Sequence, residues 1–442
     1  MNEPLPRGWT RTALGDVCRV EYGKGLPKRQ RVETGSVGVY GSAGLVGRHD
    51  NALVDKPAVI VGRKGNAGAV WHSKEPSWPI DTTYFLRVPS GTCAEYLGMQ
   101  LGTLNLVNRD SSTTIPSLRR PDLEAVSIAL APTAEQGRIV AAIEEHLSRL
   151  AVANDAITAA QARIEASRRA VLATAFAGRL VPQDPNDEPA STLLERISAD
   201  RQPSRRPPQP IADTIDPSDL TSDLPLGWTW STLGQVCSRP QYGWTTKSDR
   251  NAGLLYLRTT DISRGDVNWN KVPFCVDEPS RLEDFLLRDG DIVVCRAGTV
   301  GASLLLKNPP RSVFASYLIR LRVHREFVPA YVALFLQSPR FWAAIAHATI
   351  GIAIPNVNAK KLTAIRIPLA PFAEQERIVG VIEEHFSRLD AASGTISAIK
   401  AKIEASRRSV LAEAFAGRLV PQDANDEPAS VLLERIAEAR RA

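Results

Sequence analysis

A repeated sequence frame is the feature that most constrains this chain of 442 residues. Leu5-Pro-Arg-Gly-Trp9 returns as Leu224-Pro-Leu-Gly-Trp228, and residues 164–197 return at 403–436 with four changes in 34 positions. Between these anchors the two copies hardly match. Because a simple duplication would have drifted everywhere, the pattern indicates that the frames must stay equivalent while the inserts between them must differ.

The repeated frame is predicted to form long paired helices. Apolar residues recur at every seventh position, which is the spacing of helices that pack as a coiled coil. They are Ile143, Leu150, Ile157, Ile164 and Val171 in the first copy and Ile382, Leu389, Ile396, Ile403 and Val410 in the second. The companion positions are small or polar, namely His146, Ala153, Ala160 and Ser167. We interpret His146 and its counterpart His385 as packing residues.

The long helix of the first copy is predicted to run from Glu135 to about Ala177. Gly178 and Gly417 follow the two helices, and glycine is the usual residue just past a helix end. Shorter helices are expected from Ser191 and Ser430. About 40 helical residues at 1.5 Å each predict a rod of roughly 60 Å. We expect the two rods to pair antiparallel and to hold the inserts at opposite ends.

The inserts are predicted to be mixed, strand-rich domains. Ala58–Gly62 and Asp291–Cys295 have the pattern of buried strands followed by glycine-rich turns, whereas Glu95–Leu106 and Val328–His347 look helical. The predicted fold class is therefore α+β, with two mixed α/β domains separated by two long antiparallel helices and related by a pseudo-twofold repeat. The expected boundaries are a first domain 1–132, a helical region 133–200, a Pro/Arg-rich linker 201–223, a second domain 224–371 and a helical region 372–442.

Positive charge is concentrated in the inserts. Residues 1–130 carry 16 Lys and Arg against 12 Asp and Glu, residues 224–373 carry 18 against 10, and the two repeated helical segments are net acidic. All eight tryptophans lie in the same two ranges. Basic charge and aromatic residues where the copies diverge favour nucleic-acid binding over an ordinary solvated surface.

Other classes of protein are disfavoured by composition. No apolar run approaches the ~18 residues that a transmembrane helix needs, and the first residues lack the basic and apolar regions of a secretion signal. The five cysteines are scattered and form no CxxC pair, which argues against a disulfide framework and a zinc site. These features predict a cytoplasmic protein.

In their order along the chain, these segments resemble the specificity subunit of type I restriction-modification systems. The pattern of that family is a Leu-Pro-x-Gly-Trp opening, a target recognition domain and a helical conserved region, followed by all three again. Here the closing segment of each recognition domain would run from Ile115-Pro-Ser to Ile128-Ala-Leu-Ala-Pro132 or from Ile354-Pro-Asn to Ile367-Pro-Leu-Ala-Pro371, before Glu135-Gln136 and Glu374-Gln375. Both helices end in Ala-Phe-Ala-Gly-Arg-Leu-Val-Pro, at 175–182 and 414–421. The resemblance covers nearly the whole chain.

The resemblance implies a DNA-binding subunit with no catalysis of its own. Each recognition domain would read one half of an asymmetric bipartite site on double-stranded DNA, and the helices would set the gap. The chain would position two methyltransferase subunits and, in the full complex, two restriction subunits, without any membrane. It would bind no cofactor, whereas its partners would use S-adenosylmethionine, ATP and Mg²⁺.

Loops that place small residues beside Arg, Lys, Asn or Thr are the candidate base-reading segments. Small residues let the backbone approach DNA while a donor reaches a base edge. The candidates are Lys24, Lys28, Arg63, Lys64 and Asn66 in the first domain and Lys247, Arg258, Thr259, Arg296 and Thr299 in the second. Arg63 and Arg296 share the context Val-x-Arg-x-Gly-x-x-Gly and form a paired prediction. For any one of these residues, an ordinary solvated turn is the alternative.

No catalytic or metal-ligating residue is predicted. Asn308-Pro-Pro-Arg311 is similar to the Asn/Asp-Pro-Pro-aromatic motif of amino-methyltransferases, but Arg311 replaces the aromatic that would stack on a flipped base. We interpret this segment as a turn between strands. Three alternatives stay open: a specificity subunit of another restriction class, a stand-alone adenine methyltransferase, and a coiled-coil scaffold for proteins alone.

Overall fold

The computed structural model describes residues 4–104, 106, 117–200, 224–238, 240–249, 251, 253–262, 266–349 and 356–441. The predicted linker 201–223 lies outside these residues. Contacts divide the chain into two compact units: unit 1 is Met1–Thr158 with Ile396–Ala442, and unit 2 is Ala159–Thr395. Each unit thus combines one insert with parts of both repeated segments.

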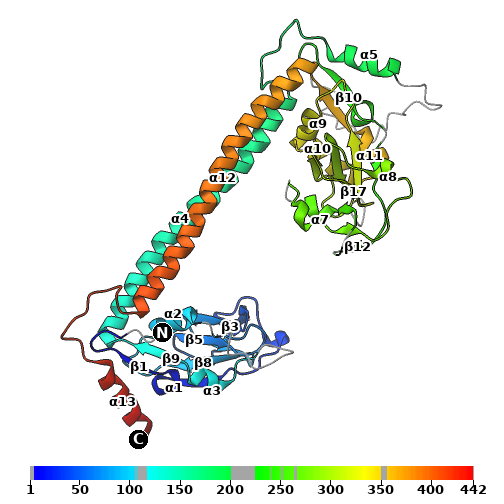
Figure 1. Cartoon of the computed structure of the whole chain (residues 1–442). Coiled ribbons are helices and arrows are strands. Elements are labelled where there is room, and N and C mark those ends of the chain that lie inside the picture. The colour runs from blue at the N-terminus through cyan, green and yellow to red at the C-terminus, as the bar shows by residue number, and fades with distance from the viewer. Residues whose placement is uncertain are drawn as a thin grey trace. The chain divides into compact units, whose positions relative to one another are not determined.

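The insert of unit 1 is built on small sheets (Figure 1). β1 and β9 pair antiparallel, a four-stranded sheet has the order β2-β8-β5-β6, and a three-stranded sheet has the order β4-β3-β7. The strands are β1 Thr10–Ala13, β2 Arg19–Tyr22, β3 Val37–Gly41, β4 Gly44–His49, β5 Ala58–Gly62, β6 Val70–Ser73, β7 Ser77–Pro79, β8 Thr83–Arg87 and β9 Ser127–Leu130. The predicted strand Ala58–Gly62 is β5, and it is buried along its whole length.

The insert of unit 2 repeats this arrangement. β10 pairs with β19, and the two four-stranded sheets have the orders β11-β18-β15-β16 and β12-β14-β13-β17. The strands are β10 Thr229–Thr232, β11 Gln241–Tyr242, β12 Ser248–Asp249, β13 Leu255–Leu257, β14 Phe274–Cys275, β15 Asp291–Cys295, β16 Ser303–Leu305, β17 Ser312–Phe314, β18 Leu318–Arg322 and β19 Arg366–Leu369. The predicted strand Asp291–Cys295 is β15 and is also fully buried.

The main sheets of the two inserts therefore share one architecture although their sequences hardly match. β2-β8-β5-β6 corresponds to β11-β18-β15-β16, and each insert also contains a short parallel pair, β3 with β7 and β13 with β17. The divergence between the inserts lies in the second sheet, which has three strands in unit 1 and four in unit 2, and in the side chains, loops and short helices around the main sheets.

Short helices cover these sheets. They are α1 Leu14–Val17, η1 Lys28–Gln30, α2 Ala94–Thr103 and α3 Arg120–Glu124 in unit 1, and α6 Leu233–Val236, α7 Thr259–Ile262, η5 Trp269–Lys271, α8 Leu282–Phe285, α9 Pro329–Phe335, α10 Pro339–Thr349 and α11 Ala359–Ala364 in unit 2. The segment predicted to be helical over Val328–His347 is divided into α9 and α10. Pro339 has no N–H for a continuing helix, but it suits the first position of a new one.

The long helices of the repeated frame are α4 (Thr133–Phe176) and α12 (Phe372–Phe415). Ile143 near the start of α4 belongs to the same hydrophobic cluster as Ala414 near the end of α12. Leu172 near the end of α4 clusters with Ile382 near the start of α12. The start of each helix therefore packs with the end of the other, as predicted for an antiparallel pair.

The seam between these helices differs in part from the predicted one. The seventh-position residues of α4, from Ile143 to Val171, are buried or half-buried. His146 and His385 are exposed, so their interpretation as packing residues is wrong. Positions three and four residues after a core residue both lie on the same face of a helix, and next to Ile143 it is the fourth rather than the third that enters the seam. In α4 the half-buried Leu147 takes the place expected for His146.

Gly178 and Gly417 end the long helices, as predicted. Their φ angles of +65° and +71° lie in the left-handed region that favours glycine. The next N–H groups, of Arg179 and Arg418, donate to Thr174 O at 3.0 Å and Glu413 O at 2.8 Å, which is the bond that closes a Schellman motif.

Each terminal glycine also allows a close contact with an opening motif. A Cβ added to Gly178 would lie 2.2 Å from Cγ of Pro225, and one added to Gly417 would lie 2.3 Å from Cγ of Pro6. The short helices α5 (Ala190–Asp200) and α13 (Ala429–Arg441) continue the contact. Their first N–H groups donate to the carbonyl oxygens of Gly227 at 2.9 Å and Gly8 at 2.8 Å. The opening of the first insert is thus packed against the end of α12, and the opening of the second insert is packed against the end of α4.

Candidate nucleic-acid interface

A buried carboxylate ties each opening motif to the repeated helices. The indole N–H of Trp9 donates to Glu135 at 3.0 Å, and that of Trp228 donates to Glu374 at 3.0 Å. Both carboxylates are 1% exposed. Each accepts a second hydrogen bond from a glutamine of the other repeat, Gln422 at 2.6 Å and Gln183 at 3.1 Å.

The glutamines next in sequence hold the start of one helix in each recognition insert, α2 in unit 1 and α9 in unit 2. The Gln136 side chain accepts from the Cys93 N–H at 2.8 Å, and the Gln375 side chain accepts from the Val328 N–H at 3.0 Å. These two N–H groups immediately precede α2 and α9. The repeated Glu-Gln pair therefore has a structural explanation in both units, and no chemistry needs to be assigned to it.

Replacing Trp9 with phenylalanine is expected to lower the free energy of unfolding by about 1–3 kcal/mol, because a buried carboxylate then loses a donor. Trp228→Phe should have the same effect on unit 2. Urea unfolding followed by circular dichroism measures both. Trp78→Phe is the control, because that indole donates to an exposed neutral group, Lys24 O, at 2.8 Å. An equal loss in all three variants would contradict the expectation.

The two buried glutamates also predict a pH dependence. Burial raises the pKa of Glu135 and Glu374, although the hydrogen bonds that they accept act in the opposite direction. An acid with a raised pKa binds its proton more readily in the folded chain, so this contribution to stability grows as the pH falls and is lost as it rises. The double variant with Glu135→Gln and Glu374→Gln should lack this pH-dependent contribution to stability. Relative to this variant, the unchanged chain should be more stable at pH 5 than at pH 7, and an unchanged difference would refute the prediction.

One end of the main sheet in unit 1 gathers several predicted DNA-binding residues around the turn 80–83. Gly23 N–H donates to Thr83 O at 3.0 Å, Lys24 N–H to Pro79 O at 3.0 Å, and Arg63 N–H to Thr82 O at 2.9 Å. This turn therefore brings the segment of Lys24 beside the loop that carries Arg63, Lys64 and Asn66. The side chains of Lys24, Lys64 and Asn66 are exposed, and that of Arg63 is half-buried.

The corresponding turn in unit 2, residues 315–318, makes the same contacts. Gly243 N–H donates to Leu318 O at 3.2 Å, Trp244 N–H to Phe314 O at 2.7 Å, and Arg296 N–H to Tyr317 O at 2.9 Å. Arg63 and Arg296 therefore occupy equivalent places in the two sheets. Their role as base readers stays a prediction.

Each of these arginines lies over a tyrosine that sequence reasoning missed. The guanidinium carbon is 5.2 Å from the Tyr22 ring centre for Arg63 and 4.8 Å from the Tyr242 ring centre for Arg296. The available signal was the Tyr-Gly pair at 22–23 and 242–243. Both glycines are sterically required, since an added Cβ would lie 2.1 Å from Ile80 O at Gly23 and 2.2 Å from Ala315 O at Gly243.

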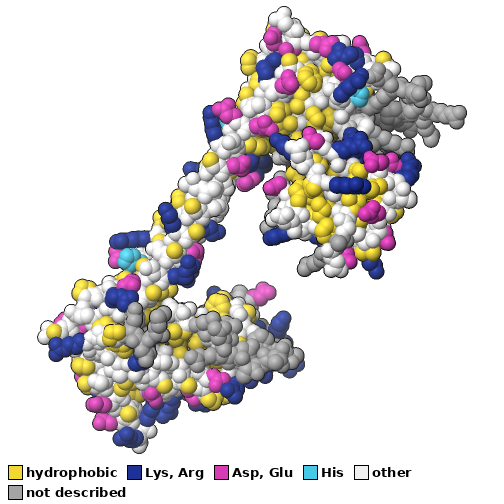
Figure 2. Space-filling view, viewed as in Figure 1, with side chains coloured by type: hydrophobic (Ala, Val, Ile, Leu, Met, Phe, Trp, Pro, Cys, Tyr) yellow, Lys and Arg dark blue, Asp and Glu magenta, His cyan; other side chains and the backbone are white. Residues whose placement is uncertain are grey.

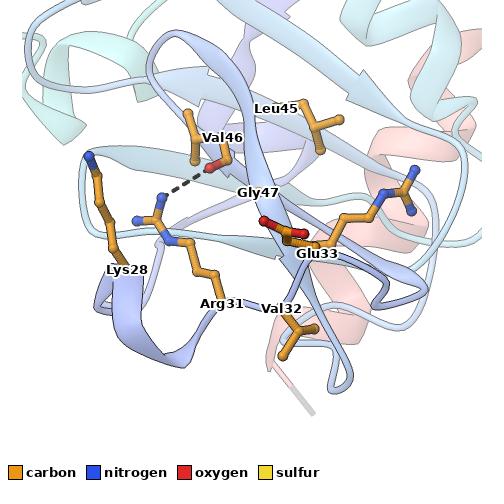
Figure 3. A pocket seen from close by; sticks show the side chains of 8 residues that line it. Lys28, Arg31, Val32, Glu33, Leu45, Val46 and Gly47 are labelled. Atoms are coloured by element: carbon orange, nitrogen blue, oxygen red, sulfur yellow. Dashed lines mark hydrogen bonds between the residues drawn. The ribbon is translucent and has the colours of Figure 1, made fainter.

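Lys28 lies in a neighbouring part of unit 1, at the start of η1. It lines an open hollow of about 640 Å³, together with Arg31 and the exposed Leu45 and Val46 of β4 (Figure 3). Arg31 donates to Val46 O at 3.1 Å and so joins the two walls. Cationic and apolar side chains together are suited to contact DNA backbone and groove surface.

The other candidates of unit 2 are in different environments. Lys247 and Thr299 are exposed, and Thr259 is the half-buried first residue of α7. Arg258 donates from Nε and Nη2 to the Asp261 carboxylate, each at 3.0 Å, and these bonds raise the pKa of its guanidinium. Arg258 would have to release Asp261 before it formed a bidentate contact with a base.

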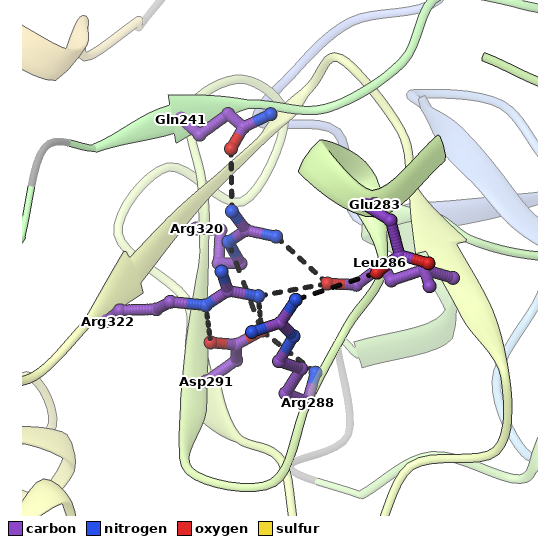
Figure 4. Close-up of polar contacts among 7 residues, drawn as sticks. All are labelled: Gln241, Glu283, Leu286, Arg288, Asp291, Arg320 and Arg322. Atoms are coloured by element: carbon purple, nitrogen blue, oxygen red, sulfur yellow. Dashed lines mark hydrogen bonds and ion pairs between the residues drawn. The ribbon is translucent and has the colours of Figure 1, made fainter. Parts of the chain in front are cut away.

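A buried arginine cluster in unit 2 provides a contrast with Arg296 (Figure 4). Asp291 on β15 is 2% exposed and accepts from Arg322 on β18 at 2.7 and 3.2 Å. Arg320, also on β18, donates to Leu286 O at 3.0 Å and to Gln241 on β11 at 2.6 Å. Burial, and then the charge of Arg322, lower the pKa of Arg320 to about 10. These arginines join three strands, and no sequence pattern indicated them.

Asn308 lies in the bend between β16 and β17, with a φ of 45°, and its N–H donates to the Asp289 side chain at 2.7 Å. This is the turn between strands that the sequence predicted.

The distribution of charged side chains does not by itself mark a DNA-binding surface. In the view of Figure 2, dark blue and magenta side chains are mixed on each unit.

Comparison with known proteins identifies the class of this protein. The profile described as "Type I restriction modification DNA specificity domain" matches residues 6–160 and 225–405. The chain belongs to this family. Its two matched segments contain the two inserts and the start of each long helix.

The named relatives have low sequence identity to this chain. The specificity subunit of the type I restriction enzyme EcoAI of Escherichia coli is 25% identical, over 63% of this chain and 56% of its own length. That of EcoDI of Escherichia coli is 22% identical, over 99% of this chain and 96% of its own length. The chain thus spans little more than half of the first of these relatives.

A solved structure shows the same fold. It comes from work on complex assembly and conformational transition of the type I restriction-modification system, and it aligns with a TM-score of 0.66 at 18% identity. The alignment covers 94% of this chain and 100% of the other. None of the helices that the structure describes has the length and apolar character needed to cross a membrane.

Proposed function

We propose that this chain is the DNA-specificity subunit of a type I restriction-modification complex and that it binds an asymmetric bipartite site. The observation that carries the proposal is the combination of like scaffolds with unlike surfaces. The main sheets of both inserts have the same strand order and place an arginine over a tyrosine at the same end, but the side chains around that pair differ. Two unlike surfaces on like scaffolds are suited to two unlike half-sites.

The proposed DNA contacts are the candidates predicted from the sequence. They are Lys24, Lys28, Arg63, Lys64 and Asn66 in the first recognition domain, 1–132, and Lys247, Arg258, Thr259, Arg296 and Thr299 in the second, 224–371. Lysines would contribute phosphate contacts, and arginine, asparagine and threonine would reach base edges. The regions 133–200 and 372–442 would set the gap between the half-sites, because paired helices resist bending.

The chemistry would belong to partner subunits. Two methyltransferase subunits would use S-adenosylmethionine to modify adenine N6, and two restriction subunits would use ATP and Mg²⁺ to cleave DNA in the cytoplasm. The near-identity of residues 164–197 and 403–436 supports equivalent binding of two like partners. This chain would itself bind none of these cofactors.

Two measurements on the purified chain test the proposal. Binding to duplex DNA should depend on sequence and should weaken steeply as salt rises, because phosphate contacts release counterions. Incubation with DNA and labelled S-adenosylmethionine should give no methyl transfer without partners. Methylation by the chain alone would identify a stand-alone methyltransferase. Absence of any DNA affinity would favour a protein scaffold.

A further inference from the structure

We propose that Arg63 and Arg296 are the equivalent base-reading residues of the two recognition domains and that each reads a guanine through the major groove. This inference rests on the proposed function and names the base that both half-sites would share. The other bases of the half-sites would differ, because the residues around the two arginines differ.

The backbone of each arginine is fixed on both sides. The Arg63 N–H is bonded to the turn 80–83, and its carbonyl oxygen accepts from the Leu118 N–H at 2.9 Å. The Arg296 N–H is bonded to the turn 315–318, and its carbonyl oxygen accepts from the Val357 N–H at 3.0 Å. Such anchoring limits the positions that each guanidinium can reach, as a base-specific contact requires.

The two guanidinium groups are held mainly by ring stacking rather than by a carboxylate. Arg63 donates once, to Asp81 O at 2.8 Å. The Arg296 Nε–H is buried and has no acceptor among the described residues. Arg320 and Arg322, in contrast, donate to a carboxylate, a side-chain amide and a carbonyl group of the protein. Arg63 and Arg296 therefore make fewer hydrogen bonds within the fold than Arg320 and Arg322, and it is the terminal Nη groups of Arg296, not its buried Nε–H, that would donate to a base.

The chemistry of this arrangement favours guanine. An arginine fork donates two parallel hydrogen bonds to O6 and N7 of guanine, and stacking on a ring sets the plane of that fork. Tyr22 is 52% exposed and Tyr242 is 37% exposed, so both ring stacks lie at the surface. Arg296 is followed by Ala297, Gly298 and Thr299, so this turn has no other cation that would form a general phosphate-binding site.

The test uses the organism that encodes the chain, with the gene deleted and then restored in variant form. Genome-wide mapping of methylated adenine gives the recognised motif for each variant. The unchanged chain should give a motif with a G·C pair in both halves. Arg63→Lys should relax that pair in one half only, and Arg296→Lys should relax it in the other half only, each by roughly 10- to 100-fold in discrimination.

Arg87→Lys is the matched control. Arg87 also lies over a ring, 5.6 Å from the centre of Phe85, but at the opposite end of β8 from Thr83. It should leave the motif unchanged. Tyr22→Leu and Tyr242→Leu, which remove the stack but keep the arginine, should relax the same positions to a smaller extent. If an arginine variant fails to fold, these tyrosine variants test whether the arginine of that domain reads the G·C pair.

Three outcomes would overturn the inference: a half-site without a G·C pair, a motif unchanged in the arginine variants, or loss of all methylation in a variant that melts like the unchanged chain. A wild-type motif that is not bipartite would bear on more than the two arginines. It would refute the proposed function itself.

Discussion

Alanine in place of Gly417 is expected to destabilise unit 1 by about 3 kcal/mol or more. The left-handed φ of +71° costs an ordinary residue roughly 1–2 kcal/mol. The new Cβ would also lie 2.3 Å from Pro6 and 3.1 Å from the Trp9 ring, so packed groups must move. Gly178→Ala should have an equal effect on unit 2, because its Cβ would meet Pro225 at 2.2 Å.

Gly137→Ala and Gly380→Ala are the matched controls. Both glycines lie inside the long helices, and an added Cβ there would meet nothing within 4 Å. Alanine at these sites should be neutral or should stabilise the chain by up to about 1 kcal/mol, because it restricts the unfolded chain more than glycine does. Thermal and urea unfolding measure all four variants. Similar losses at Gly137 and Gly417 would contradict the role assigned to the helix ends.

A longer helix pair is expected to change the gap in the recognised DNA. Duplicating residues 157–163 in α4 together with 396–402 in α12 adds one heptad to each helix. Seven residues lengthen a helix by about 10 Å, which corresponds to roughly three base pairs of DNA. Affinity for the original site should fall roughly 100-fold or more, since displacing one domain forfeits several base contacts at about 1–3 kcal/mol each.

Selection from duplexes with the same two half-sites and different gaps measures this change. The lengthened chain should prefer a wider gap than the unchanged chain. The same seven residues inserted within 201–223, outside α4 and α12, provide the control and should leave the preferred gap as it was. If both insertions shift the gap equally, or neither does, the helices do not set the spacing.

Much of the frame could be predicted because repetition and periodicity are local in the sequence. The long helices, their terminal glycines and the buried strands Ala58–Gly62 and Asp291–Cys295 were all expected and are present. The packing of His146 and His385 was predicted wrongly, because the third and fourth residues after a core position share one helix face, and here the fourth, Leu147 or Phe386, is the half-buried one. The division of Val328–His347 depends on Pro339, a local signal that the prediction did not weigh.

The candidate site was less accessible to sequence reasoning. The pairing of Arg63 with Arg296 could be proposed from their shared context, but Tyr22 and Tyr242 come from a different strand. The contact between them depends on the strand order of the folded sheet, which the sequence does not state. The same is true of Asp291 and Arg322, whose pairing depends on the register between β15 and β18. The partner of Arg258 is three residues away and was available in the sequence.

Genome-wide mapping of methylated adenine in the organism that encodes this chain, with and without its gene, would show whether the chain directs methylation to a bipartite site. If it does, one motif should disappear with the gene and should consist of two different specified halves separated by a fixed, unspecified gap. A lost motif that is continuous or palindromic, or a methylation pattern that is the same in both strains, would contradict the proposed function.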